Sequence, residues 1–464
     1  MTPGEPAEAP ARFFVETLGC PKNAVDSDKV VGSLLDDGLV PAGSVGEADL
    51  VVVNTCAFVE EARTESIDVT LALDEARKPG SRLVVTGCLA EHAGDELAAA
   101  LPEVDAVVGF AGEGWLAPVE FVRRPVESRR RPAGVRDLLE LPRPAPRAPW
   151  AYLKVAEGCD RACAFCAIPS FRGRQRSRTP ESIETEARHL VEGGVRELVL
   201  VAQDIAWYGR DVGEPHSLEP LLRRLDALRP HGLERVRMLY LYPSEVRDPL
   251  ISTVLELDTT VPYFDLSLQH ASAPLLRSMR RWGSGDLFLA MLERVRADEP
   301  DAAFRSSFIL GHPGETEADH DELLAFLDAA HLDWAGFFRY SAEDGTPSAD
   351  MEEPVTAALA DARLRECSEL QDPITATRRE ALIGRDVTVL VDTVLSETVV
   401  ENEAVKTAVG RTHREAPEID GVVTIRGPEF APGDLVEARV TGALGPDLDT
   451  RVINPANADP AEVT

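Results

Sequence analysis

The stretch EGCDRACAFCAIPSFRG, residues 157–173, places three cysteines close together: Cys159, Cys163 and Cys166. Thiolates are the soft ligands that iron–sulfur clusters require. Three ligands on a cluster of four irons leave one iron open to a substrate or cofactor. Structural zinc is the alternative, but it takes a fourth protein ligand; no Cys or His follows Cys166 within a few residues, and His189 sits in a helical pattern. The spacing therefore indicates an iron–sulfur cluster with one open iron.

This stretch directly follows an apolar strand and opens an alternation of strands and helices from about residue 150 to 340. The strands expected here are AYLKVAE, ELVLVAQD, RVRMLYLYP, YFDLSLQH, FRSSFILG and DWAGFFRYS. Six strand–helix units fit a partial (β/α)6 barrel, whose site should lie at the carboxyl ends of its strands. Polar residues at those ends are candidates for the pocket, and each could equally be structural: Gln203, Asp204, Gln269, His270 and the loop HPGET at 312–316.

Residues 12–122 show a second alternation of short β-branched runs and helical patterns, which predicts an open parallel α/β sheet. Three of its runs end in a cysteine: ETLGC at Cys20, VVNTC at Cys56 and VVTGC at Cys88. The carboxyl ends of parallel strands border one crevice, so we expect the three thiols to converge, with Gly19 and Gly87 allowing close backbone approach. One such cysteine would read as an ordinary buried thiol. Three in register predict a second cluster, also with an open iron.

The remaining segments complete the predicted organisation. Residues 123–149 hold eight Arg, six Pro and three acidic residues and predict a linker, because Pro opposes both helix and sheet. Residues 150–383 form the partial barrel together with a long connecting helix from 354. Residues 384–452 alternate as short strands and predict a small antiparallel β-barrel of the OB-like kind. Cys367, alone in the helical pattern, is expected to be a packing or surface residue and not a ligand.

Bulk properties limit the setting of this chemistry. The chain has 464 residues, enough for several domains, and no apolar run reaches the ~20 residues of a membrane span. Its first residues resemble no secretory signal, so a cytoplasmic protein is expected, in which cysteines serve metal or redox roles rather than disulfides. The formal net charge is −32. Such a charge repels phosphate backbones and attracts basic proteins, although alone it indicates only solubility.

Motifs along nearly the whole chain resemble the methylthiotransferase family of radical S-adenosylmethionine enzymes. The motifs are LGCPKNAVDSD, NTCAFVEEA, GCLAE, EGCDRACAFCAIPSFRG, ILGHPGETE and GRTHREAPEIDG. Pro21, Lys22 and Asn23 after the first cysteine, and APEIDG at 416–421, resemble the branch that modifies a ribosomal protein; tRNA-modifying members usually carry a Gln-Met-Asn type of sequence there. The resemblance implies an N-terminal methylthiotransferase domain, a radical barrel and a C-terminal TRAM β-barrel.

The resemblance also implies the cofactors and the reaction. Cys159, Cys163 and Cys166 would bind the radical-generating 4Fe-4S cluster, whose open iron chelates S-adenosylmethionine, and Cys20, Cys56 and Cys88 would bind an auxiliary 4Fe-4S cluster that carries sulfur. No catalytic residue separable from these ligands is expected. The reaction places a methylthio group on the β-carbon of an aspartate in small-subunit ribosomal protein S twelve. One S-adenosylmethionine gives the methyl group, another the radical, and a reductant such as flavodoxin or ferredoxin supplies electrons.

Three alternatives remain beside this interpretation. The first is a tRNA adenosine methylthiotransferase. Residues 385–451 hold seven Lys plus Arg against thirteen Asp plus Glu, which favours a basic protein over tRNA as the partner. The second is a non-catalytic iron–sulfur electron carrier or sensor, which explains neither the open irons nor a barrel of this size. The third is a zinc-stabilised binding protein. The terminal barrel is expected to hold the substrate and to be dispensable for S-adenosylmethionine cleavage.

Overall fold

The computed structural model describes residues 10–109, 137–400 and 403–453, and the chain forms two compact units. The first unit comprises Met1–Ala145, Ala156–Arg161 and Cys166–Arg178, and the second comprises Pro146–Val155, Ala162–Phe165 and Thr179–Thr464. Each unit is described by itself below. Within the described ranges, no helix combines the length and the apolar character that crossing a membrane requires.

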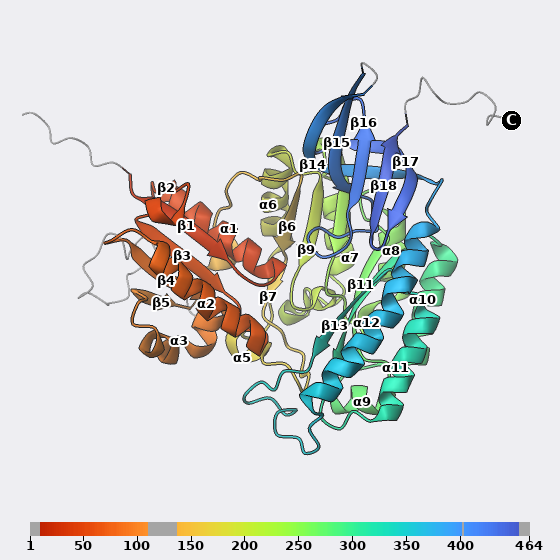
Figure 1. Ribbon diagram of the computed structural model, residues 1–464, viewed down its shortest axis with the longest axis horizontal. Helices are drawn as coiled ribbons and strands as arrows, with labels where there is room; N and C mark the ends of the chain where they lie inside the picture. The colour runs from red at the N-terminus through yellow and green to blue at the C-terminus, as the bar shows by residue number, and fades with distance from the viewer. Residues whose placement is uncertain (1–9, 110–136, 401–402, 454–464) are drawn as a thin grey trace, which may run out of the picture. The chain divides into compact units, whose positions relative to one another are not determined.

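The first unit is built on a five-stranded parallel sheet with the strand order β2-β1-β3-β4-β5 (Figure 1, red to orange). Its strands are β1 (Arg12–Thr17), β2 (Val40–Pro41), β3 (Leu50–Thr55), β4 (Arg82–Gly87) and β5 (Ala106–Val108), and its main helices are α1 (Pro21–Asp36), α2 (Glu60–Ala76) and α3 (Cys88–Ala100). The predicted open parallel α/β sheet is confirmed. The sequence prediction missed β2, because two residues are too short to show a period.

Two segments outside the predicted domain pack into the core of this unit. Leu138 and Leu141 are buried in it, although residues 123–149 were expected to form a linker; residues 123–136 lie outside the described ranges. Phe171, on the short helix α5 (Ile168–Arg172), is buried in the same core, where His92 of α3 meets it edge-on. The segment Cys166–Arg178 therefore folds as part of the first unit and not as part of the barrel.

The second unit contains a partial barrel of six parallel strands. They are β6 (Trp150–Lys154), β9 (Glu197–Val201), β10 (Arg235–Met238), β11 (Tyr263–Gln269), β12 (Ala303–Leu310) and β13 (Trp334–Arg339). The strand orders β10-β9-β6 and β11-β12-β13 are joined by two isolated parallel bridges, so the six predicted strands form one curved layer. The covering helices are α6 (Pro180–Glu192), α7 (Leu218–Asp226), α8 (Asp248–Glu256), α9 (Ala273–Ser278), α10 (Gly285–Asp298), α11 (Glu317–Ala330) and the long α12 (Ala357–Glu380). The predicted (β/α)6 barrel is confirmed.

The C-terminal strands close into a small barrel (Figure 1, blue). They are β14 (Asp386–Val400), β15 (Glu403–Arg411), β16 (Val423–Gly427), β17 (Leu435–Leu444) and β18 (Asp447–Val452), in the cyclic order β14-β15-β16-β18-β17. Four of the five strand pairs are antiparallel, but β16 and β18 pair in parallel, so the expected purely antiparallel barrel needs this correction. Five strands with this connection agree with the OB-like prediction. Strand β18 itself was not predicted.

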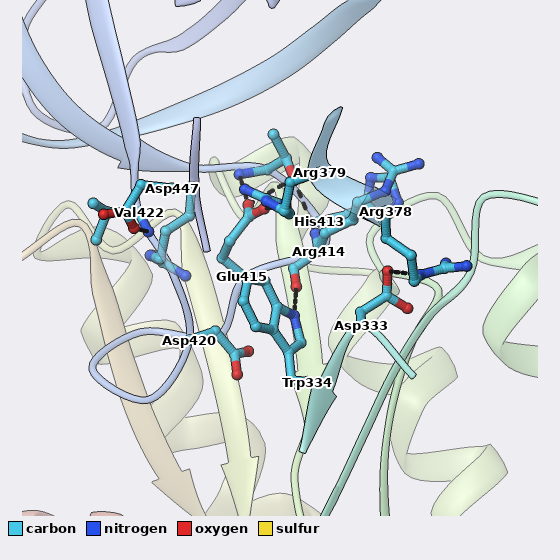
Figure 2. Close-up of polar contacts among 12 residues, drawn as sticks. Asp333, Trp334, Arg378, Arg379, His413, Arg414, Glu415, Asp420, Val422 and Asp447 are labelled. Carbon is cyan, nitrogen blue, oxygen red and sulfur yellow. Dashed lines mark hydrogen bonds and ion pairs between the residues drawn. The ribbon is translucent and has the colours of Figure 1, made fainter. Parts of the chain in front are cut away.

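The chain between β15 and β16 reaches the amino-terminal ends of the partial-barrel strands, and we call residues 411–420 the junction loop. Side chains from the starts of β10, β11 and β13 bond to it, and Figure 2 shows the bond between Trp334 and Arg414. The bonds run from Arg235 to the carbonyl of Arg411 (2.7 Å), from Arg237 to that of His413 (2.7 Å), from the Tyr263 hydroxyl to Asp420 (2.6 Å) and from Trp334 Nε1 to the carbonyl of Arg414 (2.7 Å).

Buried ion pairs fix the same junction. The carboxylate of Glu197, the first residue of β9, accepts hydrogen bonds from Arg237 Nε and Arg411 Nη1, both at 2.7 Å, and none of the three side chains is more than 2% exposed. Arg379 of α12 pairs with Glu415 in the same way (Figure 2). The small β-barrel and the partial barrel therefore share a buried polar interface opposite the strand ends at which the site is expected.

Candidate functional site

Cys20, Cys56 and Cys88 lie at the carboxyl ends of three neighbouring strands. Cys20 follows β1 and precedes α1, Cys56 directly follows β3, and Cys88 begins α3 after β4. Because β1, β3 and β4 are adjacent and parallel, these ends share one edge of the sheet. A Cβ on Gly19 would stand 2.8 Å from Cys56 Sγ, so only glycine lets the backbone beside Cys20 run this close to Cys56. The side chains of Cys56 and Cys88 are buried.

The three thiols differ in their electrostatic surroundings. Burial raises the pKa of Cys20, but the positive charges of Lys22 and Arg172 and backbone N–H donors outweigh burial, and its pKa lies below the ordinary value. Burial raises the pKa of Cys56, and it raises the pKa of Cys88 to about 11. The thiolate is the form that binds metal, and Cys20 is the most readily ionised of the three thiols.

The three thiols are the type of donor that an iron–sulfur cluster takes. In the part of the chain that the structure describes, no three His, Cys, Asp or Glu side chains are arranged to hold one metal ion. A cubane cluster binds each cysteine through a different iron, so its ligands surround it and need not converge on one point. Three soft donors on one sheet edge, two of them buried, fit that requirement.

Arg172 is a part of this site that was not selected in the sequence analysis. Its guanidinium donates to Cys88 Sγ through Nε (3.2 Å) and Nη2 (3.0 Å), and Nη2 also bonds to Asn23 Oδ1. Its Nη1 pairs with Asp26 (2.9 Å) and Glu157 (3.0 Å). The side chain of Arg172 is 2% exposed.

The CxxxCxxC loop is divided between the two units: Cys159 and Cys166 belong to the first, Cys163 to the second. The Cys159 backbone N–H donates to the carbonyl of Gly173 (3.1 Å), and the Arg161 N–H donates to Cys159 Sγ (3.4 Å). Gly158 has φ +77°, and a Cβ there would stand 2.1 Å from the Arg174 carbonyl oxygen. Glycine is therefore required at the entry to the loop.

Within the second unit, Cys163 is held at the barrel. Arg281 Nη1 donates to Cys163 Sγ (3.4 Å), and the same guanidinium lies over the ring of Tyr242 at 4.0 Å. The next residue, Ala164, donates to the Met279 carbonyl and accepts from the Ser348 N–H, both at 2.9 Å. Neither Arg281 nor Tyr242 was selected from the sequence, because an arginine after a helix and an aromatic after a strand carry no motif.

Several of the polar residues that the sequence places at the barrel strand ends make contacts that stabilise the fold. Asp204 caps a short turn by accepting from the Ala206 N–H (3.1 Å), and Glu315 pairs with Arg363 (3.1 Å). Thr316 forms a capping box at the start of α11, so most of the HPGET loop has a structural role. His270 is fully buried, its Nδ1 accepts from the Ser272 N–H (3.1 Å), and burial lowers its pKa to about 3. Its ring is therefore neutral at physiological pH.

Two other residues selected from the sequence, Gln269 and Cys367, differ in what the structure shows of them. Gln269, the last residue of β11, has φ +72°, a conformation that costs energy for a residue with a Cβ and concentrates at functional sites. Cys367 is fully buried in α12, and burial raises the pKa of its thiol to about 12. Its position inside a packed helix agrees with a packing role.

Comparison with known proteins gives three family matches along the chain. Residues 12–109 match the uncharacterized protein family UPF0004, residues 153–327 match the radical SAM superfamily, and residues 383–453 match the TRAM domain. The fold of the chain is similar to that of the radical S-adenosylmethionine methyltransferase TsrM from Kitasatospora setae, solved with cobalamin and a [4Fe-4S] cluster bound. That match has a TM-score of 0.55 at 14% identity and covers 73% of this chain and 76% of the other.

Full-length relatives share one name, ribosomal protein uS12 methylthiotransferase RimO. The relative from Kineococcus radiotolerans is 41% identical over 93% of this chain and 95% of its own length. The relative from Salinispora tropica is 42% identical over 96% of both chains, and that from Nocardioides sp. is 42% identical over 94% and 96%. With this identity over nearly the whole length, and with the radical SAM and TRAM matches in the same order, the chain belongs to the RimO family of radical S-adenosylmethionine methylthiotransferases.

Proposed function

We propose that this protein adds a methylthio group to the β-carbon of an aspartate in ribosomal protein uS12, using two 4Fe-4S clusters. Cys159, Cys163 and Cys166 would hold the radical-generating cluster with S-adenosylmethionine, and Cys20, Cys56 and Cys88 would hold the auxiliary one. The observation that carries the proposal is the presence of two separate cysteine trios, one at a sheet edge and one at the start of a (β/α)6 barrel, in a chain about 40% identical to proteins named for this reaction.

The chemistry of the reaction agrees with this assignment of the two cysteine trios. When bound, the clusters and S-adenosylmethionine supply the one-electron chemistry that an unactivated sp³ carbon requires. The chain's own residues bind and orient these groups. The donation from Arg281 to Cys163 and the fixed backbone of Ala164 hold one ligand of the radical site, and Gly19 permits the close approach at the auxiliary site.

The charge of the chain favours a basic protein as the substrate. The formal net charge is −32, and the terminal barrel, at residues 385–451, carries seven basic against thirteen acidic residues. Opposite charges accelerate the encounter of two proteins, and salt screens that attraction over a Debye length of about 8–10 Å. A tRNA ligand would instead need a basic surface to displace the counterions of its phosphates.

The deciding experiment offers both substrates to the anaerobically reconstituted enzyme. The expected product is uS12 heavier by one methylthio group in place of hydrogen, located on one aspartate by mass spectrometry. Methylthioadenosine in the tRNA digest, with the protein unchanged, would replace this substrate with tRNA. Iron content without S-adenosylmethionine cleavage would instead favour an electron carrier or sensor.

The two-cluster part of the proposal has its own test. Replacing Cys159, Cys163 and Cys166 by Ala should remove about half the iron and abolish S-adenosylmethionine cleavage, because each trio forms its own site. Replacing Cys20, Cys56 and Cys88 should remove the other half and leave cleavage to 5′-deoxyadenosine. An unchanged iron content in the second triple variant would contradict the auxiliary cluster.

A further inference from the structure

We propose that Arg172 is a positioning residue that sets the reduction potential of the auxiliary cluster by donating two N–H groups to Cys88. This inference rests on the proposed function, since it takes Cys88 as a cluster ligand. All its residues lie in the first unit. The guanidinium directs Nε and Nη2 at the Cys88 sulfur, at 3.2 and 3.0 Å, and turns Nη1 toward two carboxylates.

The environment makes this contact strong. Arg172 has 2% of its side chain exposed, and Asp26 and Glu157 have 3% and 6%, so water does not screen these charges. A buried guanidinium without partners would be costly, and the two carboxylates, with Asn23, orient it so that its remaining donors meet the sulfur. Charge-assisted donors are roughly twice as strong as neutral ones.

The direction of the effect follows from charge. Hydrogen bonds to the ligand sulfurs are among the factors that set cluster potentials, because they withdraw electron density and favour the reduced state. Two donors from one cation on Cys88 should therefore raise the potential of the auxiliary cluster. Removing them should make that cluster harder to reduce.

Arg172 and its partner Glu157 also lie close in sequence to the two ends of the CxxxCxxC loop. It ends α5, which begins two residues after Cys166, and its partner Glu157 lies two residues before Cys159. Phe171 beside it is buried in the core of the first unit. The same side chain thus fastens both flanks of the CxxxCxxC loop to the element that carries Cys88, which gives an arginine at this position a role beyond local packing.

The test isolates the auxiliary cluster in the full chain with Cys159, Cys163 and Cys166 replaced by Ala. In that background Arg172→Lys keeps a cation for Asp26 and Glu157, but a single ammonium cannot also reproduce the two donors to sulfur. The matched control is Arg143→Lys, another buried arginine that pairs with Asp28 of α1. The midpoint potential is measured by anaerobic redox titration followed by electron paramagnetic resonance.

We expect Arg172→Lys to reduce the equilibrium constant for cluster reduction about tenfold, which is about 59 mV for one electron. Arg143→Lys should leave it unchanged. Loss of the cluster from Arg172→Lys alone would overturn the proposal, because the guanidinium would then be needed to assemble the site and would not act through its potential. An unchanged potential in Arg172→Lys, or equal effects in both variants, would overturn the inference while leaving the two clusters in place. A parent protein that binds no cluster would remove the proposed auxiliary site itself, and the inference with it.

Discussion

Replacing Glu197 by Gln should destabilise the second unit by about 3 kcal/mol. The substitution keeps the shape of the side chain and removes its charge, which takes from Arg237 its buried carboxylate partner and leaves Arg411 with Asp392. Removing one partner of a buried ion pair costs roughly 3–5 kcal/mol. The pKa of Glu197 gives a similar figure: burial raises it, but Arg411 and Arg237 lower it from 4.5 to about 2, and one pKa unit corresponds to about 1.4 kcal/mol.

The assay is urea unfolding followed by circular dichroism at pH 7, with the Tm as a second measure. A loss of this size should lower the Tm by roughly 5 °C, because a unit of about 300 residues unfolds with an entropy of roughly 0.6 kcal/mol/K. Glu181→Gln is the matched control, because Glu181 pairs with Arg224 at 2.6 Å on the surface, where its side chain is 70% exposed and such pairs contribute little. If Glu197→Gln were no more destabilising than Glu181→Gln, the junction would not be held by its buried charges.

Three further outcomes follow from the structure. The free energy of unfolding should fall by about 2 kcal/mol between pH 6.5 and pH 5 through His270 alone, because its folded pKa of about 3 lies below the unfolded value and only the unfolded chain takes up the proton. His270→Gln should flatten this pH dependence of the free energy of unfolding, and an unchanged slope would contradict the prediction. A chain truncated after residue 383 should fail to fold its second unit, as judged by circular dichroism. The reason is that the starts of β9 and β10 lose Arg411 and the carbonyls of the junction loop. A truncated protein with the parent's Tm would show that the junction loop is dispensable for folding. Cys367→Ser should keep the parent's iron content. It should lower the free energy of unfolding in urea by about 1–3 kcal/mol, because it buries a hydroxyl in an apolar site. Loss of one cluster's iron would show that Cys367 is a cluster ligand.

The truncation result bears on an expectation drawn from the sequence. The terminal barrel was expected to be dispensable for S-adenosylmethionine cleavage, because it lies far along the chain from both cysteine trios. The structure argues against that separation, since Glu197 and Arg411, 214 residues apart, form a buried pair. A cleavage defect in the truncated chain would therefore reflect the lost fold and would say nothing about substrate binding.

The sequence predicted the elements well because their signals are local. Runs such as LVVVNT and RVRMLYLYP show β-branched and apolar residues over a whole strand, and each cysteine of the first trio follows such a run directly. Strands without that signal were missed: β2 has two residues, and β18, DLDTRV, is mostly polar. Local patterns therefore placed the sheets, the helices and the cysteines.

The buried charges could not be predicted in this way. Arg172, Glu197 and Arg379 belong to residue types that usually face water, and hydrophobic periodicity does not distinguish them from surface residues. Each is buried because its partner comes from a distant part of the chain: Arg172 meets Asp26 over 146 residues, and Arg379 meets Glu415 across the junction. Pairings of this kind follow from the tertiary fold, and one sequence contains no record of them.

The junction loop also has a consequence for how the protein is made. Ribosomes synthesise roughly 5–20 residues per second, so roughly 10–40 s separate the appearance of Glu197 from that of Arg411. During that interval Glu197 has Arg237 as its partner, but Arg235 and Arg237 lack the carbonyls of the junction loop, so the nascent barrel is incomplete and open to misassociation. The first unit includes no residue beyond Arg178, so all of its residues are made before Arg411. Vectorial synthesis therefore delays completion of the partial barrel until the residues of the junction loop have been made.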